Sequence, residues 1–184
     1  MILMSQHTLW LNHTQICNGV IMDFTNIFKK QKELDLAISS REDLSSVTTD
    51  EWRAKWSLAL LVEFAEFANE VQCFKYWKKH KEINHSAILE EFADVLHFLG
   101  SYAYKLEVHP IIEPKIVSKY PTDQILEIFK IASNLKSEIN KETIADLLAL
   151  SLGCAKLLNY SDEDIVKWYE IKNQKNFDRI KNHY

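Results

Sequence analysis

Apolar residues recur along most of this chain at intervals of three and four, the spacing that brings side chains to one face of a helix. The first such stripe consists of Phe24, Ile27, Phe28, Leu34 and Ile38. Helix-capping residues precede later apolar stretches, at 48–51, 84–86, 120–123 and 161–164. The predicted helices cover about residues 25–38, 48–72, 87–107, 121–137 and 141–158, and a last one starts near 161. This pattern predicts an all-α fold, a helical bundle of about five or six helices.

The first 21 residues differ from the rest because they show no clear period. They combine Gly19 with scattered His, Thr and Asn, whereas Met22 is followed at once by a helix start. We therefore expect an N-terminal extension over residues 1–21 and one all-α domain over residues 22–184.

Composition and charge exclude several classes of function. Only three of the 184 residues are Gly and three are Pro, which leaves no Gly-rich phosphate loop. The formal net charge of −4 provides no general electrostatic footprint for nucleic acid or for an anionic membrane. The longest apolar runs, such as Leu58 to Val62, are too short to span a membrane. Three cysteines without C-x-x-C spacing are typical of reduced thiols, so we expect a cytoplasmic protein.

Carboxylates occupy positions where the second predicted helix should be buried. Glu63, Glu66 and Glu70 lie on one stripe, and no Lys, Arg or His occurs between Trp56 and Phe74. The other faces are almost entirely apolar, which is typical of a buried helix. These glutamates therefore need a positive counter-charge from outside their own helix.

The third predicted helix repeats this arrangement. Glu90, Glu91 and Asp94 lie among apolar residues, and no basic residue occurs from Ala87 to Leu96. Ionised carboxylates buried without a counter-charge are costly, so a divalent cation is their simplest partner. An all-oxygen ligand set suits Mg²⁺ or Mn²⁺, and Mg²⁺ sites are often completed by substrate phosphates.

Three ordered motifs on these segments resemble those of a known family. They are E-x-x-E at 63–66, F-K-x-W at 74–77 and E-E-x-x-D-x-L-H-F at 90–98. Residues 31–35 are similar to the family's Q-x-x-L-D segment, and 169–179 to its last motif. The chain thus resembles the dimeric all-α dUTPases, which belong to the wider MazG-like nucleotide pyrophosphatases.

The resemblance implies Mg²⁺-dependent hydrolysis of dUTP, and also of dUDP, at the α-phosphorus to give dUMP. It further implies a homodimer. The metal ligands that it implies are Glu63, Glu66, Glu91 and Asp94. Either Glu63 or Glu66 would orient the attacking water or accept its proton, and the residues alone do not choose between them.

The last predicted helix supplies the basic and amide groups that the acidic helices lack. Lys172, Asn176 and Arg179 share a face; the two cations suit phosphate oxygens, and the amide suits the base or sugar. Four weaker candidates for substrate binding are Gln31, Lys75, Trp77 and His97. Gln31 offers an amide for uracil, and Lys75 and Trp77 offer a cation and a ring. His97 follows Asp94 by one helical turn.

Three other interpretations remain open. The same fold can act on another nucleotide such as dCTP, because most of these residues handle metal and phosphate. A di-iron carboxylate bundle is suggested by the pair Asp94 and His97, but its second pair, Glu82 and His85, lies in a polar run. A non-catalytic helical interaction protein is the third, although all four carboxylates are present.

Overall fold

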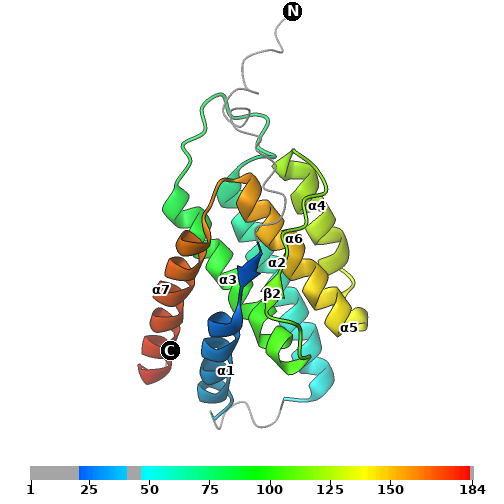
Figure 1. The fold of residues 1–184 in the computed structure, drawn as a ribbon, viewed down its shortest axis with the longest axis vertical. Helices are drawn as coiled ribbons and strands as arrows, with labels where there is room; N and C mark the ends of the chain where they lie inside the picture. The colour runs from blue at the N-terminus through cyan, green and yellow to red at the C-terminus, as the bar shows by residue number, and fades with distance from the viewer. Residues whose placement is uncertain (1–20, 41–46, 183–184) are drawn as a thin grey trace, which may run out of the picture.

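Seven helices and one pair of short strands make up the part of the chain that the computed structural model describes, residues 21–40 and 47–182. The elements are β1 (Met22–Asp23), α1 (Thr25–Ser39), α2 (Thr49–Val71), α3 (His85–Lys105), β2 (Ile111–Ile112), α4 (Pro121–Ala132), α5 (Leu135–Glu138), α6 (Lys141–Leu157) and α7 (Asp162–Lys181). The predicted all-α class is confirmed (Figure 1). Apart from Ile21, the predicted extension lies outside the described residues, so the domain start stays a prediction. Among the described helices, none has the length and apolar character to cross a membrane.

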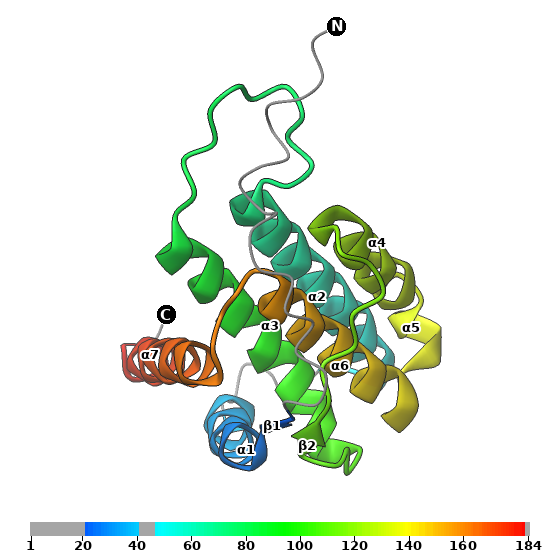
Figure 2. The same cartoon turned by 45° about the horizontal axis from the view of Figure 1, so that its top comes forward.

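Helix α3 is the centre of the bundle. It contacts α1 and α7 on one side and α2 and α6 on the other, while α4 packs on α2 and α6 (Figures 1 and 2). Leu96 and Leu99 of α3 and Phe64 of α2 are almost fully buried between these layers. Because α3 contacts both α2 and α7, it brings the acidic stripe of α2 and the basic face of α7 into one neighbourhood.

Side-chain caps fix three helix starts where the sequence predicts them. Thr48 and Glu51 form a reciprocal capping box at α2, and Ser161 and Asp164 form another at α7. The Asn84 side chain accepts a hydrogen bond from the first turn of α3. These contacts are local, which is why residue types alone identify them.

The fourth predicted helix divides into two. We expect it to run to about residue 137, but α4 ends at Ala132 and the short α5 follows. The Ser133 hydroxyl and the Asn134 amide both donate to the backbone oxygen of Lys130, at 3.0 and 3.3 Å. Such side chains compete with the helical hydrogen bonds and favour a helix end.

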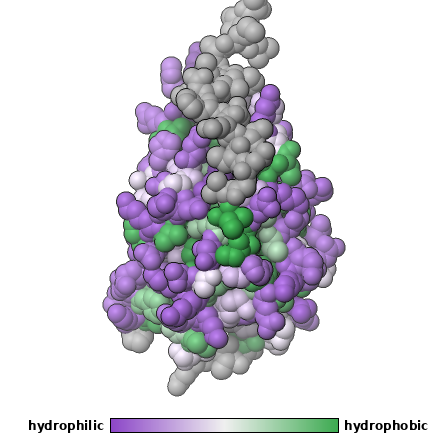
Figure 3. Space-filling view, viewed as in Figure 1, coloured by the Kyte–Doolittle hydropathy of each residue, from purple (hydrophilic) through white to green (hydrophobic). Residues whose placement is uncertain are grey.

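One face of α2 is exposed in the described part of the chain. Leu58 is 64% exposed and Val62, one turn later, is 46% exposed. The expectation that the apolar faces of this helix are buried is therefore wrong for this face. On the side of the molecule drawn in Figure 3, by contrast, the surface is largely hydrophilic.

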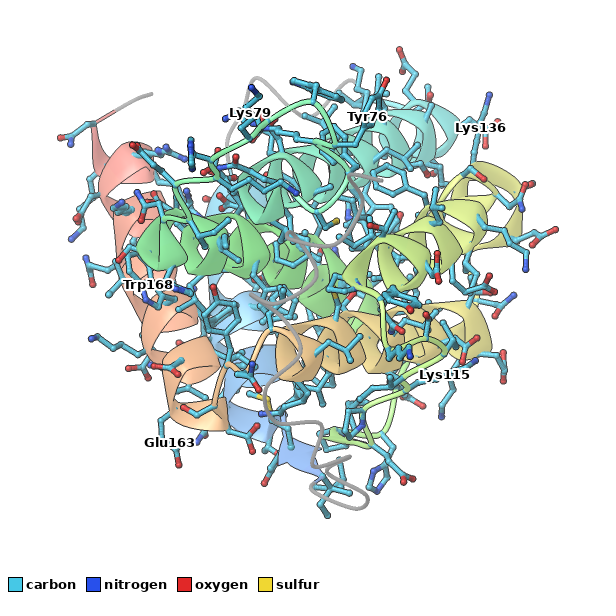
Figure 4. The ribbon with its side chains drawn as sticks, turned by 90° about the horizontal axis from the view of Figure 1, so that it is seen from above. Tyr76, Lys79, Lys115, Lys136, Glu163 and Trp168 are labelled. Carbon is cyan, nitrogen blue, oxygen red and sulfur yellow. The ribbon has the colours of Figure 1, made fainter. Side chains whose placement is uncertain are left out.

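A two-residue antiparallel pair, β1 with β2, joins the start of the domain to the segment after α3, with Met22 opposite Ile112. That segment then crosses α6, where Gly153 faces the backbone of Lys115. The Lys115 N–H donates to the Ala149 oxygen, and the Gln124 amide donates to the oxygens of Lys115 and Leu150. Figure 4 labels Lys115 beside α6.

Replacing Gly153 with Ala should destabilise this crossing. An added Cβ would lie 2.2 Å from the Lys115 backbone oxygen, so the segment would have to move. Overpacking of this kind costs about 1–3 kcal/mol, and we expect Gly153→Ala to lower the free energy of unfolding by this amount. Urea denaturation measures the change. Gly100→Ala is the matched control, since its Cβ would meet only the Gln31 side chain, at 3.4 Å; equal losses in both variants would contradict the prediction.

Candidate metal centre

Three carboxylates from α2 and α3 converge. Glu63, Glu66 and Glu91 each offer an oxygen, and these oxygens all lie within 4.8 Å of one another. Glu63 and Glu91 are half-buried, whereas Glu66 is exposed. The spacing of three on α2 puts its two carboxylates on the side that faces α3. The described residues bring no histidine into this group, so it lacks a ligand that the di-iron interpretation requires.

The pKa shifts of these carboxylates show that the Lys172 charge only partly offsets their burial and mutual repulsion. Burial, together with the negative charges of Asp94, Glu66 and Glu91, raises the pKa of Glu63 to about 7. Burial and Asp94 also raise the pKa of Glu91. A divalent ion would oppose these shifts, because its charge compensates several carboxylates at once.

Asp94, the fourth predicted ligand, already has a counter-charge. Its carboxylate pairs with the Lys172 ammonium at 2.6 Å, and Lys172 also reaches Glu90 at 3.1 Å. Lys175 completes the cluster with a 2.8 Å contact to Glu90. Burial raises the pKa of Asp94, and Lys172 and Arg179 oppose this effect. The α3 segment contains no basic residue beside its carboxylates, but the fold brings two lysines of α7, Lys172 and Lys175, against them.

A cavity of about 860 Å³ lies next to this cluster. Glu63 and Asp94 line it at the acidic side, and Asn176 and Arg179 line it from α7. Its walls also include aromatic side chains, contributed by Trp52, Trp56, Phe98 and Tyr102. A cavity lined by both charged groups and aromatic rings suits a ligand with a charged part and a planar part.

Gln31 and His97 also line this cavity, where both are buried. The His97 Nδ1 lies 2.7 Å from the Gln31 Oε1, and the Tyr169 hydroxyl donates to the same oxygen at 2.9 Å. Burial lowers the pKa of His97 to about 3, so its ring is neutral. The structure therefore places both of these predicted residues at the cavity.

Lys75 and Trp77 lie elsewhere, on the loop between α2 and α3. The Lys75 ammonium donates to the Asn69 backbone oxygen at 2.8 Å, and Trp77 is 59% exposed. Figure 4 labels two residues of this loop, Tyr76 and Lys79. The described lining of the cavity includes neither Lys75 nor Trp77, and their role in substrate binding stays a prediction.

Asp35 is not among the site residues that the sequence predicts, although it ends the 31–35 segment. The structure holds its carboxylate between α1 and α3, with donors on both oxygens from Gln31, Ser101, Tyr104 and Lys105. The sequence signals were its place at the end of the Q-x-x-L-D segment and its position four residues after Gln31, which puts both on one face of α1.

Comparison with protein-family models identifies the family of this chain. A family model described as dUTPase matches residues 23–184. A search of curated proteins finds no match. The family hydrolyses dUTP and generally uses a divalent metal. From the convergent carboxylates, the all-α fold and a match over nearly the whole chain, we conclude that this protein belongs to the all-α dUTPase family and is a dUTP diphosphatase.

Proposed function

We propose that the protein uses Mg²⁺ to hydrolyse dUTP, and also dUDP, by attack of water on the α-phosphorus. The products would be dUMP with pyrophosphate from dUTP, or with phosphate from dUDP. The observation that carries this proposal is the convergence of Glu63, Glu66 and Glu91 beside a cavity large enough for a nucleotide. The same fold acting on dCTP remains the second candidate, because the metal and phosphate groups do not distinguish the two bases.

The residues fit a magnesium site. Glu63, Glu66, Glu91 and Asp94 supply only oxygen donors, which Mg²⁺ and Mn²⁺ prefer. The pKa of Glu63, raised by burial and by its neighbours, supports a cation as the missing partner. When bound, Mg²⁺ would neutralise phosphate charge and lower the pKa of a water.

Side chains of the protein would then accept the proton of the attacking water and bind the phosphates. Between the two candidates for accepting the proton of the attacking water, Glu63 is favoured because it lines the cavity and Glu66 does not. Lys172 and Arg179 would bind phosphate oxygens, Arg179 through two parallel hydrogen bonds. Asn176, whose Oδ1 accepts from Arg179 at 3.3 Å, would contact the sugar or the base.

The other predicted residues would bind the base. Gln31 of α1 and His97 of α3 lie in the cavity wall, and His97 follows Asp94 by one helical turn. The Lys75 ammonium is bonded to the Asn69 backbone oxygen and Trp77 is exposed, so their contribution requires movement of the loop that carries them or a site on a second copy.

A homodimer is the assembly that we propose. The exposed row of Leu58 and Val62 on α2, together with the 62% exposed Leu126 on the neighbouring α4, supports a second copy as the group that covers this face. A dimeric mass in light scattering is expected; a monomer at micromolar concentration would contradict it. The cytoplasmic location stays a prediction from the cysteine pattern.

A nucleotide panel tests the function. Purified protein with Mg²⁺ would be offered dUTP, dUDP, dCTP, dTTP and UTP, and pyrophosphate or phosphate release measured. We expect preference for dUTP and dUDP and loss of activity on chelation. Preference for dCTP would overturn the base assignment, and no release from any nucleotide would favour the non-catalytic interpretation. Iron-dependent colour would favour the di-iron one.

A further inference from the structure

We propose that Asp35 is a positioning residue that sets the base specificity of the cavity. Its carboxylate holds the Gln31 amide in the one orientation that makes the His97 Nε2 a hydrogen-bond acceptor, which matches the N3–H of uracil. This inference rests on the proposed function for the identity of the base, but the state of His97 itself does not depend on it.

The surroundings of Asp35 are all donors. The Gln31 Nε2 donates to its Oδ1 at 2.8 Å. On the other oxygen, Ser101 and Tyr104 donate their hydroxyls at 2.5 and 2.9 Å, and the Lys105 ammonium lies at 2.8 Å. Burial would raise the pKa of Asp35, but the hydrogen bonds from Lys105, Ser101 and Gln31 hold it below its usual value. The carboxylate is therefore ionised, and an ionised carboxylate accepts only.

An acceptor-only partner fixes the Gln31 amide. If the amide were turned round, its Oε1 would face the Asp35 oxygen, and two acceptors would meet in a half-buried site. With the Nε2 on Asp35, the Oε1 faces His97 and Tyr169. Both of these must then donate, Tyr169 from its hydroxyl and His97 from its Nδ1.

The ring of His97 is thereby left with one tautomer. A neutral imidazole carries a single proton, so a protonated Nδ1 makes the Nε2 an acceptor. Among the described residues this Nε2 has no hydrogen-bond partner, although it is buried and His97 lines the cavity. A buried acceptor without a partner is unfavourable, which points to a ligand donor. Uracil carries hydrogen on N3, whereas cytosine presents a lone pair there.

Replacing Asp35 with Asn would allow the whole network to reverse. The Asn oxygen would keep the donors from α3, and its amide would face Gln31. Gln31 would then turn its Oε1 toward residue 35 and its Nε2 toward His97. Tyr169 tolerates this, because its hydroxyl can accept from Gln31 and donate to the Ile27 oxygen, which lies at 3.2 Å. The His97 Nε2 would become a donor, which suits cytosine.

The first test reads the tautomer in the free protein. ¹⁵N-labelled histidine gives separate NMR signals for protonated and unprotonated ring nitrogens, and His97→Phe assigns them. We expect the Nδ1–H form in the wild type and the Nε2–H form in Asp35→Asn. An Nε2–H ring in the wild type would overturn the proposal without any variant having to fold, and whether or not the protein hydrolyses dUTP.

The second test reads specificity. Asp35→Asn should lower the ratio of kcat/KM for dUTP to that for dCTP by about tenfold or more, since a site built for one N–H rejects its absence strongly. Tyr104→Phe is the matched control: it removes one donor to Asp35 and keeps the carboxylate, so tautomer and ratio should stay those of the wild type. An unchanged ratio in Asp35→Asn, or an equal change in both variants, would overturn the proposal while leaving dUTP hydrolysis standing.

Discussion

Glu63→Gln should lower kcat/KM for dUTP by at least about 10³-fold, because it removes a metal ligand and a proton acceptor whose combined effect is several kcal/mol. The amide has nearly the same shape, so the packing of α2 against α3 is retained. The affinity for Mn²⁺, measured by titration calorimetry, should fall together with the activity.

Glu70→Gln is the matched control for this change. Glu70 lies on the same helix one turn beyond Glu66, and it is not part of the convergent group in the described structure. It should keep wild-type activity and metal affinity. If Glu63→Gln kept both, or if the two variants lost activity equally, the assignment of the metal centre would be wrong.

The sequence is sufficient for features that depend on neighbours along the chain. Capping at Thr48 and Ser161 involves residues three positions away, and the acidic stripe of Glu63 and Glu66 follows from helical spacing. The break at Ser133 is equally local, but it depends on which of several competing hydrogen bonds the side chains make, and composition does not decide that.

Features that depend on distant segments could not be predicted in this way. The pairing of Asp94 with Lys172 joins α3 to α7, and the pairing of Asp35 with Tyr104 joins α1 to α3. Neither partner is recognisable from its own segment, because the contact exists only after the helices pack. The need for a metal ion as the counter-charge therefore holds for Glu63, whereas Asp94 already has a counter-charge in Lys172.

Mg²⁺ should stabilise the protein more at pH 8 than at pH 6. The folded-state pKa of Glu63 is raised to about 7 by burial and by the nearby carboxylates. Since the folded protein binds a proton that the unfolded chain has released, the contribution of this group to stability is present at low pH. It is lost as pH rises through 7. Without metal, the free energy of unfolding should thus fall between about pH 5 and 8.

Metal binding reverses this loss, because the ligands bind Mg²⁺ in their ionised form. At pH 6 a carboxyl with a pKa near 7 is about 90% protonated, so the apparent affinity should be about tenfold weaker than at pH 8. With Mg²⁺ in excess over its Kd at both pH values, stabilisation should be about 1.4 kcal/mol smaller at pH 6, a difference of about 3–5 °C in Tm. Differential scanning calorimetry measures both values. In Glu63→Gln, whose side chain has no proton to lose, the stabilisation by Mg²⁺ should differ much less between the two pH values. If Mg²⁺ raised the Tm of the wild type equally at pH 6 and pH 8, Glu63 would not be a ligand that titrates near neutrality.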